Sequence, residues 1–175
     1  MDKIGVLFVG ILGHLATTVM VGALALRRGL CSTTGMVTEL DDFSPLTLVE
    51  PKHFIFGGWD IRIGTPLENA STLLQEINPP HRHMLLDIEE ELKTIATNIF
   101  PGTAKNCGAA INEMAFNEEG RKNGRPVKEI ISRLIDDIHR FKEKHSLERV
   151  VVVNLASTEP PLSVDKRHLC KDSIH

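Results

Sequence analysis

The chain has 175 residues, of which 42% are hydrophobic and 25% are charged, and its formal net charge is −3 at pH 7. This composition excludes an intrinsically disordered chain and predicts a single domain with a packed core over residues 1–175. The slightly acidic balance offers no basic surface of the kind that binds nucleic acid, so nucleic acid is not an expected partner.

Cysteine usage indicates a reducing compartment. Cys31, Cys107 and Cys170 are odd in number, widely spaced and without a Cys-x-x-Cys pair, a pattern typical of neither a disulfide framework nor a zinc site. We therefore expect a cytoplasmic chain. His81 and His83 lack a third ligand at a recognisable spacing, so they are interpreted as surface histidines and no metal is expected.

The first predicted elements are a buried strand over Ile4–Val9 and a helix over residues 13–28, joined by a glycine-rich turn. A strand that turns directly into a helix leaves unpaired N–H groups and the positive end of the helix dipole at the turn, where a diphosphate can bind. In the pattern Gly-x-Gly-x-x-Gly, Gly10 fits the first position, Leu12 replaces the second glycine and Ala16 is an accepted third residue. The turn is therefore a candidate nucleotide site.

Two other interpretations of this segment are possible from its composition. Residues 4–26 carry no Asp, Glu, Lys or Arg and are long enough to span a bilayer, and they also resemble a secretory signal. His14, the Thr17-Thr18 pair and four glycines make the run a poor lipid-facing helix and a good strand, turn and helix. No membrane association is expected.

The remaining elements follow in chain order. The first helix should place Leu15, Val19, Gly22, Ala23 and Leu26 on its inner face. Strands are predicted at 35–40 and 53–56, with a loop at 41–51 between them and a turn at 57–60 after them. Helices are predicted over 66–77, capped by Thr65, and over 84–99, with Leu85, Ile88, Leu92 and Ile95 inside. Residues 101–124 read as an excursion from the sheet. A helix is predicted over 126–145. Its inner face should carry Ile130, Ile131, Leu134, Ile135, Ile138 and Phe141, and its solvent face should carry Asp136, Asp137 and His139. Residues 149–154 are predicted as a buried parallel strand.

This alternation predicts an α/β fold, a doubly wound and mostly parallel sheet with helices on both faces. Ligands of such sheets bind beyond the carboxyl ends of the strands. Three segments should meet there: residues 10–17, 57–60 and 155–159.

Together these segments resemble the myo-inositol-1-phosphate synthase family, also called inositol-3-phosphate synthase. The family's Gly-rich loop followed by Thr matches residues 10–18, its Phe-Gly-Gly-Trp-Asp-Ile segment occurs unchanged at 56–61, and its Ala-Ser/Asn-Thr-Glu strand end occurs at 156–159. The resemblance implies a Rossmann-like domain that binds NAD. The cofactor-contacting residues it implies are Gly10, Ile11, Leu12, Gly13, His14, Asp60, Leu155, Ala156, Ser157 and Thr158.

Some of these roles have alternatives. Asp60 is expected to bond an adenosine ribose hydroxyl, but it could instead cap the turn that follows it. Glu39 lies nearer the usual distance of the ribose-binding acid from the Gly-rich turn, yet a solvated acid is the more common case. Ser157 and Thr158 are expected to contact the cofactor, the alternative being a helix cap. Leu12 must point away from the diphosphate if NAD binds in the usual way.

The resemblance also implies a reaction and its limits. The family isomerises glucose 6-phosphate to inositol 3-phosphate through oxidation by NAD, enolisation, aldol closure and reduction by the NADH formed. Its substrate-binding and catalytic lysines lie in a second domain beyond this chain, so no catalytic residue is assigned. We expect the chain alone to be inactive, glucose 6-phosphate to bind only when that domain is supplied, and a homo-oligomer or a longer partner subunit to be possible. A different NAD-dependent oxidoreductase and a non-catalytic nucleotide-binding paralogue are the alternatives.

Overall fold

The computed structural model describes residues 3–77, 82–116 and 125–156. Its centre is a four-stranded sheet in the order β3-β2-β1-β4, in which every neighbouring pair is parallel. The strands are β1 (Ile4–Val9), β2 (Phe54–Asp60), β3 (Ile99–Pro101) and β4 (Arg149–Asn154). The order reverses direction between β1 and β4, so the predicted ligand edge lies beside the end of β1.

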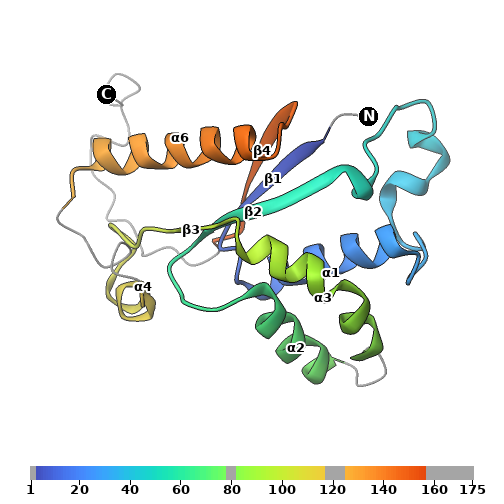
Figure 1. The fold of residues 1–175 in the computed structure, drawn as a ribbon, viewed down its shortest axis with the longest axis horizontal. Coiled ribbons are helices and arrows are strands. Elements are labelled where there is room, and N and C mark those ends of the chain that lie inside the picture. The colour runs from blue at the N-terminus through green and yellow to red at the C-terminus, as the bar shows by residue number, and fades with distance from the viewer. Residues whose placement is uncertain (1–2, 78–81, 117–124, 157–175) are drawn as a thin grey trace.

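Helices cover both faces of this sheet, as the sequence predicts (Figure 1). On one face, α1 (His14–Arg28), α2 (Pro66–Ile77) and α3 (Arg82–Ala96) enclose a core that includes Phe8 and Phe56. On the other face, α6 (Val127–Lys144) packs through Phe141 against Leu7 and Trp59. The short helix α4 (Ala109–Met114) follows β3. The doubly wound α/β fold is confirmed.

The start of α2 shows how local sequence fixes an element. The backbone N–H of Thr65 donates to Glu68 Oε2 at 2.8 Å, and the N–H of Glu68 donates to Thr65 Oγ1 at 3.2 Å. This reciprocal pair is the capping box that the Thr-Pro-Leu-Glu sequence predicts. In α3, the predicted inner face is also confirmed, because Leu85, Ile88, Leu92 and Ile95 are buried.

The turn predicted at residues 57–60 is wrong, because these residues form the second half of β2. Glycine usually weakens a strand, but here it admits close backbone approach. A Cβ on Gly58 would lie 2.1 Å from the carbonyl oxygen of Phe8, and one on Gly57 would lie 2.9 Å from that of Asn98. Tertiary packing therefore keeps two glycines in a strand that propensity alone would end.

The strand predicted at residues 35–40 is also wrong. A short 3₁₀ turn, Val37–Glu39, occupies this position outside the sheet, and Val37 and Leu40 are exposed. The strand that the prediction lacks is β3, which follows α3 and has only three residues. The helix predicted over 84–99 ends at Ala96, and β3 begins three residues later at Ile99. Such a short strand leaves no periodicity to read in sequence.

The inner faces of α1 and α6 differ from the prediction. In α1, Leu15 and Val19 are exposed, and the sheet is met by smaller or flexible residues that allow close packing, among them Ala16 and Met20. In α6, the predicted inner residues Ile131 and Ile135 are exposed. The buried residues of α6 are Ile130, Asp137 and Phe141.

Asp137 contradicts its predicted exposure because the sheet supplies partners for it. The indole Nε1 of Trp59 donates to Asp137 Oδ2 at 2.9 Å, and both Arg133 and Arg140 pair with the same carboxylate. A buried charge is tolerated where it is paired and hydrogen-bonded. The predicted orientation was wrong because one of these partners, Trp59, comes from a strand that is distant in sequence.

The strand β4 is parallel, as predicted, but it is not buried. It lies at the edge of the described sheet, and Val151 and Val152 are 46% and 47% exposed. Continuous apolar strands are typical of sheets covered on both faces. The described chain supplies only part of the cover that the sequence of β4 anticipates.

His145, at the end of α6, makes stability depend on pH. Its pKa is lowered by burial and by the positive charges of Lys144 and Lys3. The unfolded chain therefore binds a proton at a higher pH than the folded chain, so stability falls as the pH drops below about 6.5. We expect the melting temperature to decrease between pH 7.5 and 5.5 and the decrease to be smaller in His145→Gln, which keeps a donor for Asn98 Oδ1. Equal slopes in thermal unfolding would contradict this assignment.

Candidate dinucleotide site

The turn between β1 and α1 is tied to the end of β2. Gly10 has φ +87°, a conformation that side-chain-bearing residues rarely adopt, and it turns the chain out of β1. The N–H groups of Gly10 and Ile11 both donate to the carbonyl oxygen of Trp59, at 2.8 and 3.2 Å. The N–H of Gly13 donates to the carbonyl oxygen of Gly10 at 2.9 Å. The turn therefore has a fixed shape set by two strands.

Leu12, which replaces the second glycine of the pattern, points away from the turn. Its side chain is 2% exposed and belongs to the core cluster beneath α1 and α3. Its backbone stays at the turn, where its carbonyl accepts a hydrogen bond from Asn69 Nδ2 at 3.1 Å. The leucine thus leaves clear the space in front of the turn, where the sequence predicts the diphosphate, and this is the condition that its presence imposed.

The start of α1 is suited to an anion. Gly13 is the N-cap residue, no side chain caps this end within the described residues, and the first turn holds no acid. The first hydrogen bond of the helix runs from Thr17 N–H to Gly13 O at 2.9 Å, so the amides of His14, Leu15 and Ala16 precede it. His14 and Leu15 are exposed. Such a helix start binds phosphate through amides and the dipole.

Asp60 lies at the end of β2, beside this turn, with a side chain that is 2% exposed. Its Oδ2 accepts hydrogen bonds from the N–H of Leu12 at 2.8 Å and from Arg62 Nη2 at 3.2 Å. Its Oδ1 accepts from the backbone N and the Nε of Arg62 at 2.9 and 3.0 Å. The structure thus shows the hydrogen bonds that a turn-capping role requires, and the contact with a ribose hydroxyl stays a prediction.

The end of β4 meets the same turn. The N–H of Leu155 donates to the carbonyl oxygen of Val9 at 3.1 Å, and the N–H of Ala156 donates to Asn154 Oδ1 at 3.0 Å. A Cβ on Gly10 would lie 3.9 Å from both Leu155 O and Ala156 N. Residues 10, 60, 155 and 156 are therefore brought together, while Ser157 and Thr158 lie outside the described residues.

Glu39 lies away from this turn, whereas Arg62 lies beside it. Glu39 belongs to an exposed 3₁₀ turn and accepts a hydrogen bond from Thr33 Oγ1 at 3.2 Å. Figure 1 shows its segment, in light blue, at the end of the sheet where the strands begin, opposite the glycine turn. Arg62 has no part in the sequence prediction, although an arginine two residues after a strand-end aspartate could have suggested it.

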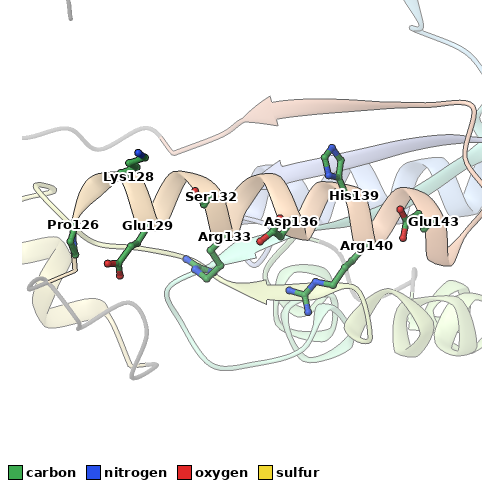
Figure 2. A pocket seen from close by; sticks show the side chains of 9 residues that line it. All are labelled: Pro126, Lys128, Glu129, Ser132, Arg133, Asp136, His139, Arg140 and Glu143. Carbon is green, nitrogen blue, oxygen red and sulfur yellow. The ribbon is translucent and has the colours of Figure 1, made fainter.

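A large surface hollow lies elsewhere. It runs along the solvent-facing side of α6, and Figure 2 shows that its lining comes from that helix and its cap residue alone, with mixed polar and charged side chains. These are Pro126, Lys128, Glu129, Ser132, Arg133, Asp136, His139, Arg140 and Glu143. One open helix face encloses no ligand, so we place the site at the glycine turn.

Neither a membrane-spanning helix nor a cluster of metal-ligating side chains occurs in the described part of the chain. None of its helices combines the length and the apolar character needed to cross a bilayer. The residues that the structure describes also contain no group of three or more His, Cys, Asp or Glu side chains placed to hold a metal ion.

Comparisons with known proteins agree on one family. A family model described as myo-inositol-1-phosphate synthase matches residues 4–174. Inositol-3-phosphate synthase 1 of Bacteroides thetaiotaomicron is 32% identical, over 95% of this chain and 39% of that protein. Inositol-3-phosphate synthase isozyme 1 of Arabidopsis thaliana is 26% identical, over 90% of this chain and 34% of that protein.

A solved structure has the same fold. Inositol-3-phosphate synthase from Caenorhabditis elegans superposes with a TM-score of 0.64 at 21% identity, over 94% of this chain and 36% of that one. The chain therefore spans between 34% and 39% of the length of these relatives.

Proposed function

The chain belongs to the myo-inositol-1-phosphate synthase family, whose cofactor is NAD, and we propose that it holds the diphosphate of NAD at the turn between β1 and α1. The observation that carries this placement is the uncapped start of α1 beside Gly13, with the Leu12 side chain buried in the core. Amides and a helix dipole are the donors that a diphosphate needs. The residues present therefore fit the cofactor.

The rest of the dinucleotide is expected to extend from this turn toward the ends of the neighbouring strands. We propose contacts from Gly10, Ile11 and Gly13 on the turn and from Leu155 and Ala156 at the end of β4. Asp60, Ser157 and Thr158 complete the proposed set. NAD, when bound, supplies a hydride acceptor, while these residues bind and orient it.

Calorimetric titration with NAD tests the proposal. We expect saturable binding with one cofactor per chain and a higher melting temperature in its presence, because a ligand that binds the folded state stabilises it. A folded chain that shows no binding at millimolar NAD would contradict the proposed function.

We further propose that the 175 residues bind NAD without isomerising glucose 6-phosphate. Phosphate binding and enolate stabilisation require cations placed beside the nicotinamide. No lysine occurs in residues 4–18, 54–66 or 149–156, the segments that form or flank the site, and their arginines are Arg62, which is paired with Asp60, and Arg149 at the opposite end of β4. Incubation of the purified chain with NAD and glucose 6-phosphate should release no inositol phosphate, and turnover near 1 per second, within the usual enzyme range, would refute this.

The same assay separates the other enzymatic possibility. An isomerase recycles its cofactor, whereas an NAD-dependent oxidoreductase leaves NADH in proportion to product. Accumulation of NADH, measured by absorbance, would favour the oxidoreductase.

An oligomer is the second proposal, and the exposed flank formed by α6 and β4 supports it. Val127, Ile131 and Ile135 recur every four residues along α6 and are 51%, 51% and 47% exposed. The strand β4 is the edge of the described sheet. Open edges and apolar stripes favour association. We propose that a second copy covers this flank. Light scattering should show a dimer, and Ile131→Glu should weaken it. A monomeric wild type would contradict this proposal and favour a longer partner subunit instead.

A cytoplasmic location is also proposed. Cys31 and Cys107, the cysteines in the described part of the chain, are both free thiols. Free thiols are usual in a reducing compartment.

A further inference from the structure

Arg62 is a cation at the glycine turn that the cofactor pattern does not include. Its Nε donates to Asp60 Oδ1 at 3.0 Å and its Nη2 donates to Asp60 Oδ2 at 3.2 Å, so two parallel bonds hold the guanidinium. A Cβ placed on Gly13 would lie 3.9 Å from the same Nη2. The guanidinium therefore lies next to the N-cap of α1.

The two members of this ion pair differ in exposure. The side chain of Asp60 is 2% exposed and that of Arg62 is 35% exposed. A guanidinium carries five N–H donors, and the two bonds to the carboxylate leave the others for a second anion. The buried carboxylate thus fixes the orientation of a cation that still reaches solvent.

We propose that Arg62 binds the diphosphate of NAD together with the first amides of α1, and that Asp60 is the positioning residue that holds Arg62 there. This inference rests on the proposed function. A helix start supplies only about half a positive charge, whereas the diphosphate brings two negative charges, so a full cation beside Gly13 complements it. Arginine also suits phosphate because its planar fork can donate two bonds to it.

The position of Arg62 decides between two phosphate groups. An arginine near the ribose-binding acid can also accept the 2′-phosphate of NADP. The short distance to Gly13 favours the diphosphate, which lies over the start of the helix. It also gives Asp60 a role that does not require ribose contact, because its Oδ2 already accepts from the N–H of Leu12 and both of its oxygens accept from Arg62.

The test is calorimetric titration of the wild type, Arg62→Ala and Arg62→Lys with NAD, ADP, NADP and adenosine. We expect Arg62→Ala to weaken NAD and ADP binding by about tenfold or more, as for loss of a charge-assisted bond, and to leave adenosine binding unchanged. Arg62→Lys should lie between the two, since it keeps the charge and loses the fork. Equal affinity for NAD in Arg62→Ala, a loss confined to NADP, or an equal loss for adenosine would each overturn the proposal.

Two controls keep the result interpretable. Arg62→Ala leaves the buried Asp60 without its ion-pair partner, so the double variant Asp60→Asn with Arg62→Ala removes that charge as well and should lose at least as much NAD affinity. Arg28→Ala removes one charge at the opposite end of α1, where Arg28 pairs with Glu91, and should bind NAD like the wild type. Wild-type chain that fails to bind NAD refutes the proposed function, whereas normal binding by wild type and double variant refutes only the role of Arg62.

Discussion

Replacing Gly13 with leucine is expected to abolish NAD binding while leaving the chain folded. Gly13 has φ −76° and ψ 156°, an ordinary extended conformation that leucine adopts without strain. The added Cβ would lie 3.1 Å from the carbonyl oxygen of Gly10, which requires a shift of a few tenths of an ångström. The rest of the side chain would then occupy the space in front of α1 that the diphosphate needs.

The expected loss of affinity is roughly a hundredfold or more, which corresponds to about 2.8 kcal/mol. Calorimetry with NAD measures it, and circular dichroism with thermal unfolding checks the fold. The matched control is Gly22→Leu on the same helix, where an added Cβ meets no atom within 4 Å. If Gly13→Leu binds NAD as tightly as this control, the phosphate site has been placed wrongly.

The glycine turn could be predicted from sequence because its determinants are local. A strand, a helix and the glycines between them lie within residues 4–28, and the positive φ of Gly10 needs no distant partner. The direction of the Leu12 side chain, by contrast, depends on a core built by α1 and α3, so the sequence could state the condition but not its outcome.

The environment of Asp60 could not be predicted, for the same reason. Its partners include a backbone amide 48 residues away and an arginine that turns back toward it. The sequence indicates a carboxylate at a strand end and leaves its partners open. The pairing of Asp137 with Trp59, 78 residues away, is a second case, in which helical periodicity predicted exposure and the sheet supplied a buried donor.

The exposure of β4 shows the limit of composition as a guide. Its run of valines predicts a strand covered on both faces, yet β4 is the edge of the described sheet. The composition of a strand reflects the surroundings in which that strand is stable. The relatives compared above are more than twice as long as this chain. Within the described residues the valines of β4 and the apolar stripe of α6 stay exposed, and this is the flank at which the oligomer is proposed.

Replacing Gly58 with alanine is expected to have the largest effect on stability. A Cβ at this position would lie 2.1, 2.8 and 2.9 Å from the O, N and C atoms of Phe8. These are backbone atoms of β1, a central strand hydrogen-bonded on both sides, so no flexible side chain can move aside. Relief would require β1 and β2 to separate at the centre of the sheet. We expect a loss of about 4 kcal/mol or more, a large part of the total stability of a domain of this size.

Urea unfolding measures this loss, and the fluorescence of Trp59 is a suitable signal because it is the only tryptophan in the chain and lies next to Gly58 in β2. Gly22→Ala is the matched control: its Cβ meets no atom within 4 Å, and the exchange inside a helix should stabilise the chain by about 0.5–1 kcal/mol. Where Gly58→Ala is too unstable to purify, its insoluble expression beside a soluble Gly22→Ala gives the same answer. A Gly58→Ala chain within about 1 kcal/mol of the wild type would show that β1 and β2 do not approach as closely as the structure has them, and the position of Asp60 beside the glycine turn would then need another explanation.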